Sequence, residues 1–309
     1  MGKERVTKPR SPTRWANNIS SLLNTVRGLN HFPISVTEVA LDLSKNWFPD
    51  DPLALIQGEN LPGFDGALLP KPKGMKGWGI LYNRSISSKG RINFTLAHEF
   101  GHYLLHRIAF PNGMRCSQQD FLRWESEYKQ IESEANTFAS YLLMPFDDYR
   151  RQIDAGAVAT FDMLSHCAER YEVSLIAAIL RWLLYTERRA LLVVSRDGFV
   201  DWARSSQPAF KSGIYIKTVG VPPIELPANS IAANPAAFGD ARLGFNHPAG
   251  VWFSEPCHEM CIVSESYEFT LSVVQLAPGS GNRSFPQHED NDDDHTEPLG
   301  DQIKRIHDV

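Results

Sequence analysis

The stretch "AHEFGHYLLH", residues 97–106, places three histidines and a glutamate among apolar side chains. If the stretch is helical, His98 and His102 lie one turn apart on the same face. Two imidazoles arranged in this way can bind one zinc ion, and Glu99 is placed to act as a general base toward water activated by that ion. The H-E-x-x-H pattern therefore predicts two metal ligands, His98 and His102, and a catalytic glutamate, Glu99.

The residues around this pattern carry no charge, which predicts that the helix is buried. They are Thr95, Leu96, Ala97, Phe100, Gly101, Tyr103, Leu104 and Leu105. Buried histidines and glutamates need polar partners, and a zinc ion would supply them. The competing interpretation is a core helix with hydrogen-bonded histidines and a solvated Glu99. His106 extends the four-residue spacing, but a fourth protein ligand would close a catalytic site, so His106 is not predicted to bind the metal.

A catalytic zinc needs a third protein ligand and one open position. The extended pattern H-E-x-x-H-x-x-G-x-x-H would place a third histidine at position 108, which is Ile108, so that class of site is excluded. A glutamate on the next periodic segment, Glu125 to Leu143, is the alternative. The candidates there are Glu125, Glu127, Glu132 and Glu134.

Helical phase chooses among these glutamates. The apolar face of the segment consists of Ala135, Phe138, Ala139, Leu142 and Leu143. Glu132 borders this face, whereas Glu134 points about 100° away from Ala135. Glu132 is therefore the predicted third ligand, while Glu125 and Glu127 are expected to be solvated. Asn136, one turn after Glu132, is placed to hydrogen-bond a ligand histidine.

Composition sets the class of the protein. A chain of 309 residues with 42% hydrophobic content can bury a large core and is expected to form two domains. The whole chain has a net charge of −5, and residues 287–309 carry eight acidic and two basic residues. The rest of the chain is therefore close to neutral and has no surplus of basic residues for direct nucleic-acid binding. The most apolar segment, 174–185, is too short to cross a membrane and contains Arg181.

Four cysteines without an apolar leader indicate a cytoplasmic location with free thiols. "PCHEMC", residues 256–261, brings two of them close to His258 and Glu259. The spacing of Cys257 and Cys261 is looser than that of a zinc knuckle, and no second cysteine pair completes four ligands. These two residues are therefore predicted to be ordinary thiols.

Periodicity divides the chain into four parts and predicts an α+β fold. Residues 1–16 are interpreted as a disordered basic lead-in, and 17–188 as a domain with a small sheet, an active-site helix and a helical bundle. Strands are expected at 66–69 and 78–82. From 190 to 278, β-branched and alternating runs predict a β-rich accessory or sensor domain, followed by an acidic disordered tail at 279–309.

Five segments together resemble the ImmA/IrrE family of zinc metallopeptidases. They are "FDGALLP", "GILYN", "RINFTLAHEFGHYLLH", "ESEANTFASYLLMP" and "CAERYEVSLIAAILRWLL", within about 34–187. The resemblance implies a zincin-like fold and a gluzincin-like site, with His98, His102 and Glu132 as zinc ligands and Glu99 as general base. It also implies a protein substrate, a helix-turn-helix repressor whose cleavage releases stress-response or mobile-element genes.

The resemblance leaves several features open. Many relatives carry an N-terminal helix-turn-helix domain, which this chain is not expected to have, and the likeness stops near residue 190. The segment 77–83 is a candidate strand for pairing with substrate. Tyr171, His166 and His106 are candidates for stabilising the oxyanion, and none is assigned. The alternative function is a zinc-containing sensor that sequesters its partner without cutting it. Oligomeric state stays open.

Overall fold

The computed structural model describes residues 11–117, 125–264 and 268–279, which form two compact units. The first unit takes the described residues up to Asp148 together with Ala168–Ser174. The second takes Tyr149–Cys167 and the described residues from Leu175 onward. Within the described part of the chain, no helix combines the length and apolar character needed to cross a bilayer.

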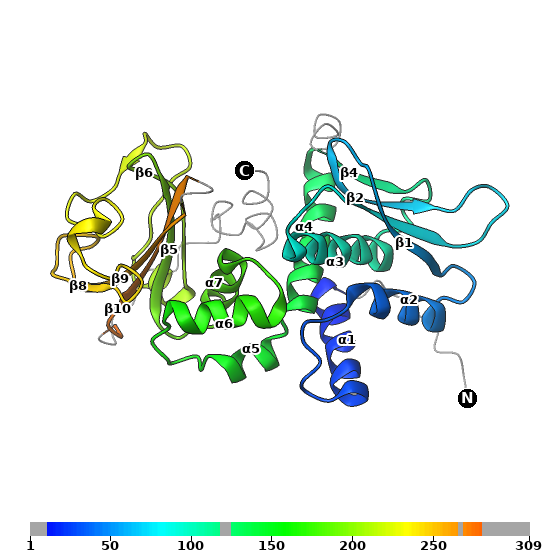
Figure 1. Cartoon of the computed structure of the whole chain (residues 1–309), viewed down its shortest axis with the longest axis horizontal. Coiled ribbons are helices and arrows are strands. Elements are labelled where there is room, and N and C mark those ends of the chain that lie inside the picture. Colours follow the sequence, from blue (N-terminus) through cyan, green and yellow to red (C-terminus); the bar gives the residue numbers. More distant parts are fainter. Residues whose placement is uncertain (1–10, 118–124, 265–267, 280–309) are drawn as a thin grey trace. The chain divides into compact units, whose positions relative to one another are not determined.

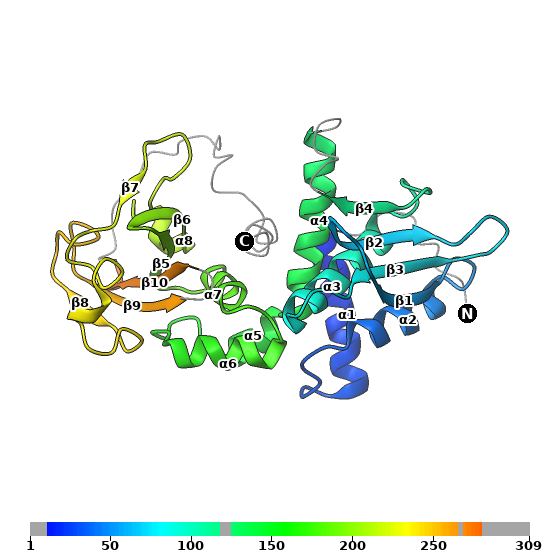
Figure 2. The ribbon, with the colours of Figure 1, turned by 45° about the horizontal axis from the view of Figure 1, so that its top comes forward.

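In the first unit, helices pack on a four-stranded sheet. The helices are α1 (Pro12–Arg27), α2 (Val36–Trp47), α3 (Lys89–Leu105) and α4 (Glu125–Leu143), and the strands are β1 (Leu53–Glu59), β2 (Phe64–Pro70), β3 (Trp78–Asn83) and β4 (Met114–Ser117). The strand order is β1-β3-β2-β4, with β1 parallel to β3 and the other pairs antiparallel. Figure 2 shows α3 lying against this sheet with α4 beside it.

Helix α3 occupies the centre of the first unit. Its N-terminus is capped by Ser88, whose hydroxyl accepts from the backbone N–H of Arg91, and every residue from Phe94 to Leu104 is buried. A helix that is buried all round needs neighbours on several sides. Sheet strands β2 and β3 and helices α2 and α4 provide them (Figure 1). The uncharged surroundings of the H-E-x-x-H pattern therefore reflect burial, as predicted.

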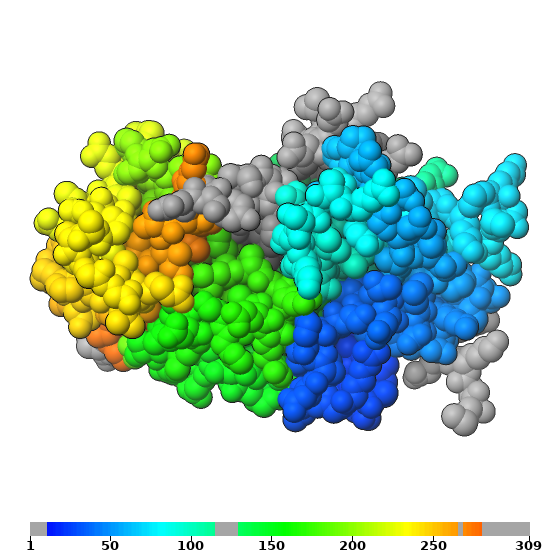
Figure 3. Space-filling model, viewed as in Figure 1, coloured from blue at the N-terminus to red at the C-terminus, as the bar shows by residue number. Residues whose placement is uncertain are grey.

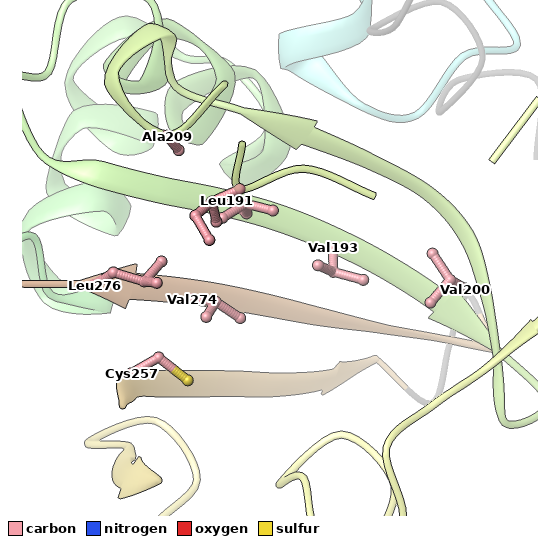
Figure 4. Close-up of a cluster of buried hydrophobic side chains, with 8 residues drawn as sticks. Leu191, Val193, Val200, Ala209, Cys257, Val274 and Leu276 are labelled. Atoms are coloured by element: carbon pink, nitrogen blue, oxygen red, sulfur yellow. The ribbon is translucent and has the colours of Figure 1, made fainter. Parts of the chain in front are cut away.

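The second unit contains a six-stranded antiparallel sheet in the order β7-β6-β5-β10-β9-β8. Its strands are β5 (Arg189–Arg196), β6 (Phe199–Ser205), β7 (Ile224–Glu225), β8 (Phe245–His247), β9 (Cys257–Ser264) and β10 (Phe269–Leu276). Its core contains Leu191 and Val193 of β5 and Val274 and Leu276 of β10, with Cys257 beside them on β9 (Figure 4). The short helix α8 (Gln207–Lys211) packs on β5 and β6.

Three further helices follow α4: α5 (Phe146–Gln152), α6 (Phe161–Tyr171) and α7 (Leu175–Leu183). The predicted boundary at 188–190 differs from the observed grouping, since residues 149–167 and 175–187 belong to the second unit. The reason is direct packing: α7 contacts β5, and the Gln275 side chain of β10 exchanges two hydrogen bonds with the backbone of Ala159 (3.1 and 2.8 Å). A change from helical to β pattern therefore does not mark the limit of a compact unit here.

The mixture of helices and strands confirms the α+β prediction, while some local predictions were wrong. Residues 12–16, expected in a disordered lead-in, begin α1, because Ser11 caps the helix and Pro12 fits its first turn. In Figure 3 the blue atoms of α1 adjoin those of α2, so α1 is part of the first unit. Strands β1 and β4 were not among the strands expected from the sequence. They form because pairing within the sheet compensates for a weak local signal. Residues 1–10 and 280–309 lie outside the described residues.

Candidate metal centre

Helix α3 presents His98 and His102 on one face, as the four-residue spacing predicts. Both side chains are buried, with exposures of 5% and 0%. Their Nε2 atoms lie 2.9 Å apart, so the two rings converge on one point. Glu99, between them in sequence, is also fully buried.

Helix α4 brings Glu132 to the same point. Gly101 of α3 makes the close approach of the two helices possible: a Cβ there would lie 3.0 Å from the Phe138 ring and 3.3 Å from the Ala135 Cα. Glu132 Oε2 lies 3.4 Å from His98 Nε2, and its Oε1 lies 3.3 Å from His102 Nε2. The side chain is 6% exposed. The structure therefore brings together the three residues selected from the sequence.

The spacing of the three donors fits one small divalent cation. Ligand atoms about 2.0–2.1 Å from a tetrahedral ion lie about 3.3 Å from one another. The observed separations are 2.9, 3.3 and 3.4 Å. Among the described residues, this is the group of three whose ligand atoms could hold a metal ion. Two imidazole nitrogens and a carboxylate oxygen form a donor set typical of zinc with a position left for water.

The far side of each histidine ring also has a partner. His98 Nδ1 lies 2.8 Å from Asn136 Oδ1, which matches the predicted role of Asn136. His102 Nδ1 lies 3.0 Å from His106 Nδ1, and His106 Nε2 lies 3.1 Å from Glu134 Oε2. Contacts of this kind orient the rings of ligand histidines.

The neighbouring histidines set the charge state of Glu132, and burial sets that of His106. Burial by itself would raise the pKa of Glu132, but the neighbouring His98 and His102 outweigh it and hold that pKa well below the usual value. Burial, followed by the charge of His102, lowers the pKa of His106. The site therefore combines an ionised carboxylate with a neutral imidazole at His106.

Glu99 owes its place to a glycine on the neighbouring strand. A Cβ on Gly66 of β2 would lie 2.8 Å from Glu99 Oε1 and 2.6 Å from Thr95 Cγ2. Contacts shorter than 3 Å cannot be kept, so a larger residue at position 66 would displace one of these side chains. Gly66 thus leaves the room that the Glu99 carboxylate occupies.

Residues 54–183 match the family model described as the IrrE N-terminal-like domain, Peptidase_M78. Residues 54–183 therefore form a domain of the ImmA/IrrE peptidase family. This IrrE-like domain has the zincin-like arrangement of a small sheet and an active-site helix expected from the sequence. The match ends at Leu183 and does not include strands β5–β10. A search of the curated proteins found none that matches this chain.

The remaining candidates of the sequence analysis have their own partners or lie outside the described residues. Tyr171 is fully buried and donates to Asp148 Oδ2 at 2.7 Å, and His166 is exposed on α6. His106 contacts His102, and none of the three is assigned to an oxyanion. The side chains of Glu125 and Glu127 lie outside the described residues.

The proposed strand addition at residues 77–83 was wrong. This segment forms β3, which pairs with β1 on one side and with β2 on the other, so its backbone hydrogen bonds are used within the sheet. The ends of the described sheet are β1 and β4. Sequence shows that a segment can be a strand, but neighbours in the sheet decide whether its edge is exposed.

The side chains of Cys257 and Cys261, the second group considered as a metal site, lie too far apart to share a metal ion. Both cysteines are free and lie on β9, where residues four apart are about 13 Å from each other. They cannot share one ion. Glu259 accepts hydrogen bonds from the backbone N–H groups of Ile231 and Ala232, and His247 Nε2 lies 2.8 Å from it. This carboxylate anchors a loop to the sheet.

Proposed function

We propose that this protein is a zinc-dependent endopeptidase that cleaves a helix-turn-helix transcriptional repressor and so releases stress-response or mobile-element genes. The single observation that carries the peptidase part is the convergence of His98, His102 and Glu132, whose ligand atoms lie within 3.4 Å of one another. Glu99 follows His98 directly in the sequence. The match of residues 54–183 to the IrrE N-terminal-like domain supports the same part. The repressor substrate follows from the family resemblance.

The roles of the chain's own residues follow from their chemistry. His98, His102 and Glu132 would hold the zinc, and when bound it would activate water and polarise a peptide carbonyl. Glu99 takes a proton from the attacking water as the new carbon–oxygen bond forms. It then passes that proton to the leaving amine as the carbon–nitrogen bond breaks. Burial of Glu99 limits competing proton exchange with bulk water.

The test combines zinc, the substrate and one conservative substitution. The purified protein is incubated with the repressor encoded by the neighbouring gene, with zinc and with a chelator, and the products are analysed by mass spectrometry. We expect zinc-dependent cleavage at one bond. Glu99→Gln should retain zinc and lose cleavage, whereas the control Glu38→Gln, which changes an exposed residue of α2, should cleave normally.

Three results would contradict the proposal. Cleavage by Glu99→Gln at the wild-type rate excludes Glu99 as the general base. Failure of the wild-type protein to bind zinc excludes the metal centre. Stable binding of an uncut repressor, with zinc present, favours the alternative of a sequestering sensor in which the 190–278 region responds to a ligand.

A further inference from the structure

A chain of hydrogen-bonding groups runs from His102 to the surface of α4. His102 Nδ1 lies 3.0 Å from His106 Nδ1, and His106 Nε2 lies 3.1 Å from Glu134 Oε2. The other oxygen of Glu134 accepts from the Gln130 side chain at 3.0 Å. His106 is 6% exposed, and the Glu134 side chain is 34% exposed. The chain therefore joins a buried histidine to a carboxylate that water can reach.

The direction of these hydrogen bonds follows from the carboxylate. An ionised carboxylate only accepts, so the proton between His106 and Glu134 belongs to His106 Nε2. A neutral imidazole carries one N–H, which makes His106 Nδ1 an acceptor. The proton between the two histidines therefore belongs to His102 Nδ1. His102 is then left with a lone pair on Nε2, the atom that lies 3.3 Å from Glu132 Oε1.

We propose that His106 and Glu134 are a positioning pair that holds His102 in its metal-binding tautomer and orientation. The inference rests on the proposed zinc site and adds two residues to it. His106 acts through His102, and Glu134 acts through His106. Neither residue contacts the predicted metal position directly.

The two predicted ligand histidines differ in how they are held. His98 faces the neutral amide oxygen of Asn136, at 2.8 Å. His102 faces a second imidazole that is itself tied to a charged group. The Glu134 carboxylate makes His106 a stronger acceptor, and His106 in turn raises the basicity of the His102 ring. We therefore expect His102 to depend on residues of α3 and α4 together, and His98 on Asn136.

The experiment measures zinc affinity of the full chain by competition with a chromogenic chelator at one fixed pH. His106→Phe removes the acceptor for His102 and should weaken zinc binding about 10–100-fold. His106→Asn places an amide oxygen near the former Nδ1 position and should recover most of this loss. Glu134→Ala should weaken binding about 10-fold, and the double variant should be no weaker than His106→Phe alone.

Two further measurements separate positioning from packing. Nitrogen chemical shifts of the histidine rings, recorded without zinc, should show the Nδ1–H form of His102 in the wild type and a mixture of tautomers in His106→Phe. Glu38→Gln, which removes an exposed carboxylate of α2 paired with Arg27 at 3.4 Å, serves as the matched charge control and should leave zinc affinity unchanged.

Different results would contradict the positioning pair and the proposed function. If the wild-type protein binds no zinc, or if His98→Ala binds it equally well, the metal centre itself is wrong. If the wild type binds zinc and the His106 and Glu134 variants bind it with equal affinity, the positioning pair is wrong. Additive losses in the double variant also overturn it, because Glu134 would then act independently of His106.

Discussion

Replacement of Gly66 by alanine tests the structure at the proposed general base. Strand β2 places the new methyl group 2.6 Å from Thr95 Cγ2, 2.8 Å from Glu99 Oε1 and 3.0 Å from Glu99 Cγ. Non-bonded carbon atoms prefer separations of about 3.5–4.0 Å, so Thr95 and Glu99 must together give way by roughly 1 Å. The methyl group is expected to cost about 1–3 kcal/mol of folding stability.

The expected effect on function is larger than the effect on stability. A displacement of about 1 Å in a catalytic group can lower a rate about 10²-fold. We therefore expect Gly66→Ala to cleave the repressor about 100-fold more slowly than the wild type. Zinc affinity should change much less than the cleavage rate, because the three atoms nearest to the new methyl group belong to Thr95 and Glu99 and not to a predicted ligand.

A neighbouring glycine offers a matched control. Gly79 lies on β3, and a Cβ there would meet only Leu55, at 3.8 Å, which is an ordinary contact. Initial cleavage rates, chelator competition and urea unfolding are measured on both variants. Equal cleavage rates for Gly66→Ala and Gly79→Ala would refute the argument. Parallel loss of zinc affinity and activity in Gly66→Ala would also refute it, since the cause would then lie in the ligands.

Four further predictions concern Asn136, Arg107 and the two cysteines of β9. Asn136→Ala leaves the Nδ1–H of His98 without its acceptor and should weaken zinc binding about 10–100-fold in chelator competition, with unchanged affinity contradicting that role. Arg107 packs on two aromatic rings and donates two hydrogen bonds. Arg107→Ala should therefore lower the free energy of unfolding in urea by about 2–3 kcal/mol. A decrease below about 0.5 kcal/mol would show that these contacts add little to stability. Burial raises the pKa of Cys257 to about 11 and that of Cys261 to about 12, so both should resist alkylation at pH 8.5 in the native protein, as read for each residue by mass spectrometry. Because the unfolded chain loses these protons at lower pH, the free energy of unfolding should fall from about pH 8.5 to 11, and a rise over that range would contradict the burial argument.

The three residues that converge could be selected from the sequence because each choice depends on local helical geometry. His98 and His102 are four apart on one helix, and that spacing alone sets them on one face. Glu132 was selected by the phase of its own helix, and the distances of 3.3 and 3.4 Å to the two histidines agree with that choice. Helical phase says which face a residue occupies without knowledge of the rest of the chain.

Helical phase could not identify residues whose roles depend on a side chain of another element that packs against them. Helical phase directed Glu134 away from the apolar face of α4, yet its carboxylate lies 3.1 Å from the ring of His106, the residue that caps the C-terminus of α3. Gly66 looked like an ordinary strand glycine, and only the packing of β2 on α3 shows that it makes room for Glu99. The spacing of His102 and His106 was visible, but the acceptor beyond His106 was not.

By itself, the sequence determined the helix that carries H-E-x-x-H, the third predicted ligand, the α+β class and the change to β structure near residue 190. These features follow from periodicity within single segments, which is encoded locally. Only the tertiary structure decided that β3 is an internal strand, that the helices after residue 148 divide between two units, and that Glu134 lies behind His106. Each of these depends on segments far apart in the chain meeting in space, and the pattern of one segment contains no record of its neighbours.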